Sequence, residues 1–201
     1  MNKLLVLLAG VFLSIPGFAM TGSYGVSSDY MWRGISQTDG NPSIWACLDQ
    51  NIGKGFYVGG CAMNVDFNDD AKVETDLYGG YSVVKNKFNM NLGYAAYRYD
   101  DSAKNFEEKY MSVGYGPIKV GKFYGQDLAP DYEWVDLNLP FLNFADVTLH
   151  YGDYDGVLDK SVNIEYSLSD SMSIGVLVQS DIRDSDVDLG DAVSLHFTTK
   201  F

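Results

Sequence analysis

Apolar and polar residues alternate with a period of two along most of the chain. In the segment 191–201, for example, Val193, Leu195 and Phe197 fall on one side of an extended chain, while Ser194 and His196 fall on the other. This period is that of a β-strand with one apolar face, and no segment keeps the helical period of about 3.6 residues. Twelve such segments follow one another: 22–32, 43–52, 56–66, 73–84, 88–99, 107–115, 118–126, 132–141, 144–153, 160–168, 172–182 and 191–201. The sequence therefore predicts an all-β protein.

The connections between these segments alternate between two lengths. Tight turns are expected at Gly53-Lys54-Gly55, Lys85-Asn86-Lys87, Gly116-Pro117, Leu142-Asn143 and Ser169-Asp170-Ser171. Longer or more polar loops are expected between them, at 34–42, 100–105, 154–159 and 183–190. Short turns at one end and long loops at the other are typical of bacterial outer-membrane barrels. The pattern predicts an antiparallel up-and-down transmembrane β-barrel of twelve strands.

Strand length and strand number agree with this fold. A membrane strand needs about 9–11 residues, which the segments supply. An even strand number leaves both termini of the chain on the periplasmic side. The segment 191–201 would pair with 22–32 to remove the last open edge. Its final residue, Phe201, resembles the terminal aromatic of such barrels, which implies the barrel-assembly machinery as a partner.

The two faces of most segments separate cleanly, as a wall between lipid and water requires. In 160–168, Val162, Ile164 and Tyr166 oppose Asn163 and Glu165. A Lys or Arg on the lipid face costs about 2–4 kcal/mol at the middle of the bilayer, so such sorting is expected if one face meets lipid. A soluble β-sandwich is the alternative, because it also alternates. Aromatic residues near segment ends favour the membrane fold. They include Tyr24, Tyr30, Phe56, Phe88, Tyr97, Tyr99, Phe141 and Phe201.

One segment cannot be oriented from its pattern. In 118–126, Lys119 and Lys122 fall on opposite faces, so neither face is free of charge.

The N-terminus has the pattern of a cleaved signal peptide. Lys3 precedes an apolar run over 4–15, and the small residues Gly17 and Ala19 follow. This predicts a signal peptide at 1–19 and a barrel at 20–201, exported to the bacterial outer membrane. An uncleaved anchor is the alternative, although the run is short for a spanning helix.

The charge balance excludes nucleic acid as a partner and suggests what the lumen prefers. The chain carries 27 acidic against 14 basic residues, whereas binding phosphates requires clustered Lys and Arg. The residues expected to line the pore are Asp29, Arg33, Asp49, Glu74, Asp76, Asp136, Asp146, His150, Glu165 and His196. Because rings of Asp and Glu favour cations, we expect a cation-leaning channel for small hydrophilic solutes or ions. Acidic loops that are merely solvated, or that bind divalent ions bridging lipopolysaccharide, are the alternative reading.

The stretch Ser28-Asp29-Tyr30-Met31-Trp32-Arg33-Gly34-Ile35-Ser36-Gln37-Thr38-Asp39-Gly40-Asn41-Pro42 resembles the signature of a known family. The family is that of the TorF-type porins, which carry the Gcw_chp domain and are of uncertain function. Gly55-Phe56-Tyr57-Val58-Gly59 with Asn64-Val65 resembles its second hairpin. The resemblance covers 26–66 and implies an outer-membrane barrel with a channel role and no established substrate.

Asp29 and Arg33 also have an interpretation of their own. Four residues apart in strand phase, both would point into the lumen near its outer mouth. Arg33 then either pins the first loop inward or contacts solutes. The run 36–42 has the residues of a turn, with Gly40 and Pro42.

Cys47 and Cys61 lie at equal distances from Lys54, the centre of the first hairpin turn. Directly opposed residues bring their Cβ atoms to about 4.5–5.5 Å, which is near enough for a disulfide in an oxidising compartment. Free thiols are the alternative. Two cysteines without a histidine cluster predict no metal site.

Catalysis is not expected. Ser194 and His196 share a face, but no Gly-x-Ser-x-Gly elbow and no phosphate-binding or dinucleotide motif occurs, so we predict no enzyme and no cofactor. A second possible function is a non-conducting structural or ligand-binding barrel. In that case Tyr57, Tyr78, Tyr97, Tyr110 and Trp134 would plug the lumen.

Overall fold

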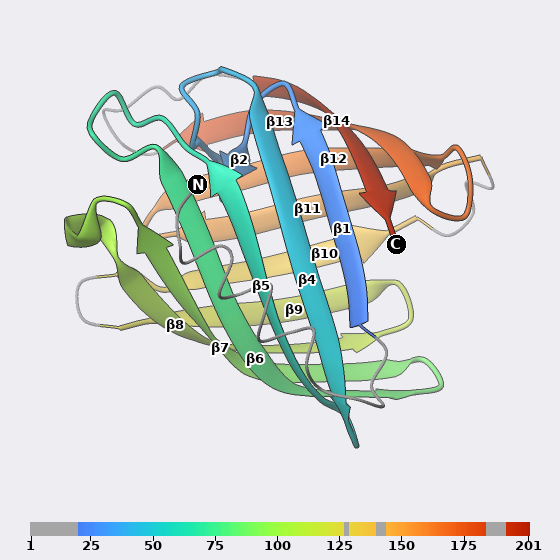
Figure 1. Cartoon of the computed structure of the whole chain (residues 1–201). Helices are drawn as coiled ribbons and strands as arrows, with labels where there is room; N and C mark the ends of the chain where they lie inside the picture. Colours follow the sequence, from blue (N-terminus) through green and yellow to red (C-terminus); the bar gives the residue numbers. More distant parts are fainter. Residues whose placement is uncertain (1–19, 127–128, 140–143, 184–191) are drawn as a thin grey trace.

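The computed structural model describes residues 20–126, 129–139, 144–183 and 192–201, and it is a closed antiparallel barrel of twelve strands (Figure 1). The wall consists of β1 (Met20–Ser27), β4 (Ser43–Gly53), β5 (Phe56–Asn64), β6 (Val73–Lys85), β7 (Phe88–Tyr99), β8 (Phe106–Tyr115), β9 (Ile118–Gly125), β10 (Tyr132–Asn138), β11 (Asp146–Tyr154), β12 (Val157–Ser167), β13 (Met172–Arg183) and β14 (Ala192–Lys200). Neighbours in sequence are neighbours in the wall, and β14 pairs with β1. The all-β, twelve-strand prediction is confirmed.

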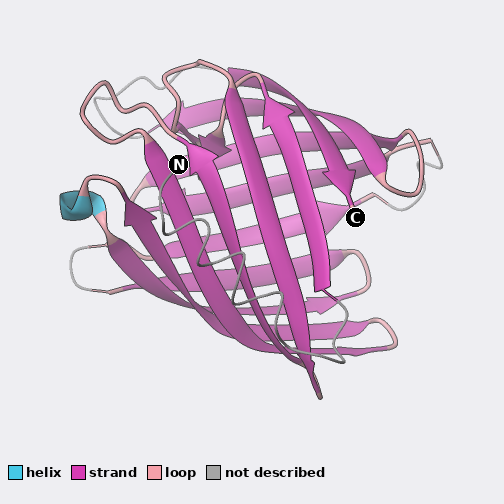
Figure 2. Cartoon of the chain, in the orientation of Figure 1, coloured by secondary structure: helices cyan, strands magenta, loops and turns pink. Residues whose placement is uncertain are grey.

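The alternation of residues located most of the wall. Eleven of the twelve predicted strands have ends within three residues of those observed. The 3-10 turn η1 (Ser102–Lys104) lies at the end of the barrel that carries the longer loops (Figure 2). Within the described residues no helix is long and apolar enough to cross a membrane.

The first predicted strand, 22–32, was wrong in its second half. The wall strand β1 ends at Ser27, and the chain then leaves the wall to form a small hairpin from β2 (Met31–Trp32) and β3 (Ile35–Ser36). Polar groups cause the departure, because the Asp29 carboxylate accepts hydrogen bonds from Ser36 and Thr38 at 2.7 and 2.9 Å. Asp29 and Arg33 are therefore not in strand phase with each other.

The loop expected at 154–159 was also wrong. Strands β11 and β12 pair up to Tyr154 and Val157, which leaves a two-residue turn, Asp155-Gly156. Both turn residues have positive φ, 52° and 86°, as a tight hairpin with a Gly in second place adopts. Asp159 therefore belongs to the wall and not to a loop.

The outer face of the wall is apolar over most of its height. Its exposed side chains include Val26, Ile44, Leu77, Leu92, Val113, Val120, Val135, Leu149, Ile164, Ile174, Val193 and Leu195. Exposed aromatic side chains gather toward the strand ends, as interfacial girdles do. Phe56, Phe88, Tyr115, Tyr166 and Phe201 lie toward the end with tight turns, and Tyr94, Tyr124 and Tyr151 toward the other.

Strand β9, which could not be oriented from its sequence, turns Ile118 and Val120 outward. Lys119 therefore points into the lumen, where its Nζ lies 5.2 Å from the centroid of the Trp134 ring. Lys122 points outward near the rim and pairs with Glu133 at 2.7 Å and Asp131 at 3.0 Å. Its charge is thus kept at the edge of the apolar band.

The barrel closes as expected through the segment 191–201. Residues Ser23–Ser27 pair with Lys200–His196 in antiparallel register. Phe201 and Gly22 exchange two backbone hydrogen bonds of 2.9 Å, and the Phe201 ring lies 6.3 Å from that of Tyr24. The signal peptide expected at 1–19, the turn at Leu142-Asn143, Phe141 and the loop 184–190 lie outside the described residues.

Candidate functional site: a hairpin across the lumen

The residues 28–42 cross the barrel interior as a strap, the name used below for this segment. Its hairpin turns at Arg33 and Gly34, which have φ values of 48° and 84°. A left-handed backbone conformation is energetically unfavourable for a residue that has a Cβ atom, such as arginine. Other contacts must therefore hold Arg33 in this conformation. Across the strap, the Gln37 N–H donates to the Tyr30 carbonyl at 2.7 Å.

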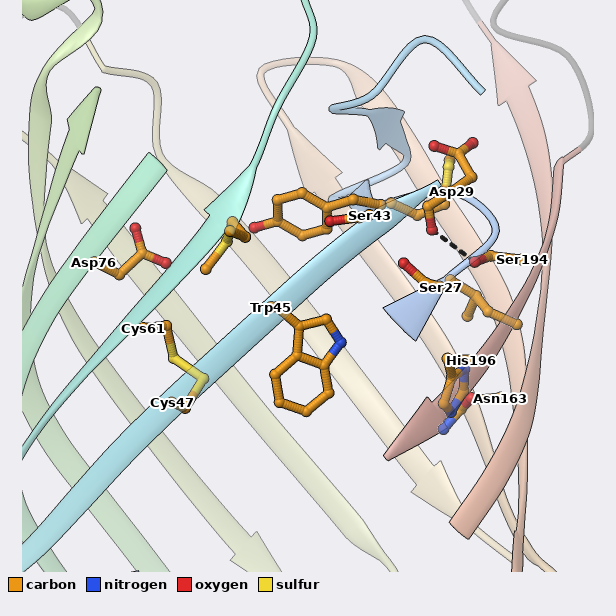
Figure 3. Close-up of a pocket in the computed structure, with 14 residues that line it drawn as sticks. Ser27, Asp29, Ser43, Trp45, Cys47, Cys61, Asp76, Asn163, Ser194 and His196 are labelled. Carbon is orange, nitrogen blue, oxygen red and sulfur yellow. Dashed lines mark hydrogen bonds between the residues drawn. A yellow bond between two sulfur atoms is a disulfide. The ribbon is translucent and has the colours of Figure 1, made fainter. Parts of the chain in front are cut away.

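One side of the strap is fastened to the wall beside β14. The Ser194 hydroxyl donates to the Asp29 carbonyl at 2.6 Å, as Figure 3 shows. The Leu195 N–H donates to the Ser28 hydroxyl at 2.9 Å. Farther along, the Asp66 N–H donates to the Gln37 carbonyl at 2.8 Å, which ties the strap to the loop between β5 and β6.

The other side of the strap is held by a buried ion pair. The Arg33 guanidinium donates to both carboxylate oxygens of Glu108 on β8, at 2.7 and 2.6 Å. The side chains are only 5% and 0% exposed. A two-pronged pair of this kind fixes both position and orientation, so Arg33 holds the strap across the lumen from β1 to β8.

Four aromatic rings surround the same guanidinium. Its Cζ lies 4.1 Å from the Trp32 ring centroid, 4.6 Å from Phe123, 4.5 Å from Tyr132 and 5.2 Å from Tyr154. Ring faces attract cations, and the attraction is stronger when water is excluded. Together with Glu108, the three wall rings form what we call the Arg33 cage.

Among the cavities lined by described residues, two lie inside the barrel and share Asp76. The first, of about 440 Å³, lies beside β1, β4 and β14 and is shown in Figure 3. Asp29, Trp45, Asn163 and His196 are among its lining residues. The second, of about 370 Å³, lies against β5 to β10. All five aromatic residues predicted to fill the interior line it: Tyr57, Tyr78, Tyr97, Tyr110 and Trp134.

His150 lies between two carboxylates of the lumen. Its Nδ1 is 2.6 Å from Asp136 Oδ1, and its Nε2 is 2.6 Å from the Tyr132 hydroxyl and 3.3 Å from Asp159 Oδ2. Tyr132 also donates to Asp159 at 2.9 Å. The ring of Tyr132 belongs to the Arg33 cage. The contacts of its hydroxyl with His150 and Asp159 therefore help to fix the position of that ring.

The remaining residues expected to line the pore are spread along the inner face. The Asp49 carboxylate accepts a hydrogen bond from Tyr78 at 2.6 Å, and that of Glu165 accepts one from Ser173 at 2.5 Å. Asp146 is paired in register with Glu165 near the end with tight turns. Glu74 is buried, with 2% of its surface exposed.

A disulfide joins Cys47 and Cys61, directly opposite each other on β4 and β5 with their Cα atoms 4.1 Å apart. The yellow bond in Figure 3 shows that it borders the first cavity. Among the described residues no group of three or more His, Cys, Asp or Glu side chains is arranged to hold a metal.

Two acids of the lumen were missed by reasoning from the sequence. Glu108 follows Glu107, and two adjacent acids give no indication of which one faces inward. The alternation of Glu108 with Tyr110 and Ser112 on one face was the available signal. Asp159 was missed because it was assigned to a loop.

Acidic residues at the outer mouth form a set of short-range contacts. Lys72 Nζ lies 2.6 Å from Asp66, and Lys104 Nζ lies 2.7 Å from Asp69. These hydrogen bonds from lysine hold the pKa of Asp66 and of Asp69 below its ordinary value. The backbone N–H of Lys72, which donates to Asp100 at 2.8 Å, does the same for the pKa of Asp100.

A closed twelve-stranded barrel with an apolar outer face and a polar, cavity-containing interior is the architecture of an outer-membrane porin. A family model described as "Bacterial protein of unknown function (Gcw_chp)" matches residues 14–132. The chain belongs to this family. Among curated protein sequences nothing matches.

Solved structures share the fold at low identity. A KdgM porin is 10% identical with a TM-score of 0.63, covering 90% of this chain and 98% of that chain. A KdgM porin in complex with disordered oligogalacturonate is 9% identical with a TM-score of 0.62, covering 91% of this chain and 98% of that chain. The Salmonella typhi outer membrane phospholipase dimer is 10% identical, covering 96% and 95% of the two chains, and its TM-score of 0.49 is too low to support an argument.

Proposed function

We propose that the protein is an outer-membrane channel that passes small hydrophilic solutes or ions and prefers cations. The observation that carries the proposal is a closed barrel whose inner face carries mostly acidic charges and encloses cavities. Asp29 and Asp76 border the first cavity, and Asp76 and Lys119 border the second. An interior of this kind favours water and cations over lipid and anions. The outer membrane is the compartment that suits a lipid-facing barrel of this type.

The charges of the inner face support the preference for cations. Inward-facing acids on the described strands include Asp49, Glu74, Asp76, Glu108, Asp136, Asp146, Asp159 and Glu165. The positive charges of the same region have partners of their own, because Arg33 forms an ion pair with Glu108 and Lys119 lies over the Trp134 ring. Oligogalacturonate, which one of the KdgM structures contains, is a chain of sugar acids. The acidic lumen here is a poor match for such an anion.

The strap sets the narrowest passage in this proposal. It leaves one cavity on the side of β14 and one on the side of β9, and Asp76 borders both. A solute would pass beside Arg33 and Asp76, so the strap determines which sizes are admitted.

A non-conducting, plugged barrel is the second candidate, and one observation favours it. The Arg33 cage and the five aromatic residues of the second cavity occupy much of the interior between the strap and β8. Liposome swelling separates the two functions. Vesicles containing the wild-type barrel should swell in solutions of small sugars and of ammonium salts if it is a channel. Swelling no faster than in protein-free vesicles would support the plug.

We propose transport rather than catalysis, and the contacts of His150 fit this proposal because both nitrogens of its ring are engaged. Its Nδ1 contacts Asp136 and its Nε2 contacts Tyr132 and Asp159, so neither is left to activate a serine. A His that serves as general base needs a nucleophile on one of them.

The outer surface suits the partners expected from the sequence. Lys109, Lys122 and Lys160 face outward on β8, β9 and β12 near the strand ends with longer loops, beside Tyr94, Tyr124 and Tyr151. Cations at this height are placed to contact the phosphates of lipopolysaccharide, and we propose this lipid as a partner. We also propose that the assembly machinery recognises the strand that ends in Phe201.

A further inference from the structure

Glu74 and Asp76 are successive inward-facing residues of β6 and lie close together in the lumen. Glu74 is paired in register with Tyr99 on β7, and Asp76 is paired with Tyr97. Asp76 borders both cavities, whereas Glu74 lies one step nearer the outer mouth. The pair therefore stands where a solute would cross from one cavity to the other.

Each of these carboxyl groups leaves one oxygen without a protein partner. Glu74 Oε2 and Asp76 Oδ1 are buried and accept no hydrogen bond. Glu74 as a whole is 2% exposed. Of the ion pairs found among the described residues, none involves either side chain. Arg33, a cation of the same region, is occupied by Glu108.

Two adjacent buried carboxylates without a cation are unstable, because the charges repel and water cannot solvate them. Something positive must lie between them, either a metal cation or a proton shared by the two groups. The cavities beside Asp76 give a hydrated cation a route to the pair. The acids of the inner face raise the local concentration of cations.

We propose that Glu74 and Asp76 bind a hard divalent cation, Ca²⁺ or Mg²⁺, inside the lumen. The ligands available are carboxylate oxygens, which these ions prefer over nitrogen and sulfur. Two carboxylates are fewer than a tight site supplies, so water completes the coordination shell and the affinity is low. Low affinity fits a channel, in which an ion must be able both to enter a site and to leave it.

This inference deepens the proposed function, since it names a permeating or blocking ion, but its test does not require that the barrel conduct. Purified full-length barrel in detergent is titrated with Tb³⁺, whose luminescence is excited through nearby tyrosines such as Tyr99. Ca²⁺ is then added as competitor. The variants are E74Q and D76N, which keep side-chain size, and the control is D70N in the exposed outer loop. Retarded gel migration without heating shows that each variant is folded.

The wild type and D70N should bind Tb³⁺ saturably, with displacement by Ca²⁺. Because loss of an outer-shell partner already weakens metal binding by about 10- to 100-fold, E74Q and D76N should each lose at least about tenfold in affinity. Equal binding by the wild type and both lumenal variants would overturn the proposal and place the ions at the outer loops. If the folded wild type and D70N also show no saturable binding, the proposal is overturned in favour of a proton shared by the two carboxyl groups. Either result leaves the conductance, and with it the channel proposal, to be judged separately.

Discussion

Arg33 and Glu108, 75 residues apart in sequence, form two hydrogen bonds of 2.7 and 2.6 Å inside the barrel. This pair converts a surface-type loop into a strap across the lumen. Burying two charges removes their hydration, and this free-energy cost is offset only by near-ideal hydrogen-bond geometry and further attraction. The surrounding rings supply that attraction. The strap is therefore held by a small number of named contacts, which makes it open to direct tests.

Replacing Arg33 by Ala should widen the passage and weaken the barrel. The variant leaves Glu108 as an unpaired buried charge, and breaking such a pair typically costs about 3–5 kcal/mol. Single-channel conductance should rise, and the midpoint of urea unfolding in lipid should fall. Lys109→Ala is the matched control, because Lys109 is the exposed neighbour of Glu108. Unchanged conductance together with lower stability would assign Arg33 a purely anchoring role.

The cavity left by Arg33→Ala should accept a free guanidinium ion. Glu108, Phe123, Tyr132 and Tyr154 would still present a carboxylate and three ring faces to it. Added guanidinium at millimolar concentration should therefore reduce the raised current of this variant, whereas methylammonium should act more weakly because it cannot bond in two places. A current that responds identically to the two ions would contradict the cage.

How much of this interior was predictable depends on whether a residue belongs to a regular strand. Alternation oriented His150, Glu165 and the strand 191–201 because a one-residue slip would move every apolar side chain to the wrong face. The register of the first hairpin placed Cys47 opposite Cys61 for the same reason.

The strap was not predictable in this way. Its position depends on a contact between Arg33 and Glu108, and no periodic pattern connects residues so far apart. Tyr30 and Trp32 continue the apolar alternation of Tyr24 and Val26, so the sequence pattern continues beyond the residue at which the wall strand ends. Turn residues at 36–42 indicated a loop but gave no information about whether it folds inward or outward. The likeness to the family was carried by this same stretch.

The bridge between Cys47 and Cys61 should stabilise the first hairpin of the wall. The two residues are separated by 14 positions, for which the chain-entropy model gives roughly 3 kcal/mol. Cys47→Ser with Cys61→Ser should lower the free energy of unfolding by about this amount while leaving the barrel closed. Alkylation of the unreduced wild type, followed by mass measurement, checks the bridge itself. Two modified thiols would show that it is absent.

Acid should loosen the outer loops only at low pH. The pKa values of Asp66 and Asp100 are lower in the folded loop than in the unfolded chain. Their contacts therefore stabilise the loop above the unfolded value of about 3.9, and this contribution is lost as the pH falls through the lowered folded value. Carboxyl carbon NMR titration should give midpoints below about 3.9 for both.

Lys72→Met removes the side-chain hydrogen bond to Asp66 and keeps the backbone hydrogen bond to Asp100, so the variant separates the causes of the two lowered pKa values. It should raise the midpoint of Asp66, which accepts from the Lys72 ammonium, and leave that of Asp100, which accepts from the Lys72 backbone. Equal shifts of both midpoints would mean that the loop had rearranged as a whole.

Conduction by this barrel and its preference for cations are both measured by the reversal potential in a planar bilayer. Wild-type protein is recorded with a tenfold KCl gradient across the membrane. A cation-preferring channel should give discrete conductance steps and a reversal potential of the sign set by K⁺, and this potential should move toward zero in Asp76→Asn. The absence of steps, or a reversal potential of the sign set by Cl⁻, would contradict the proposed function.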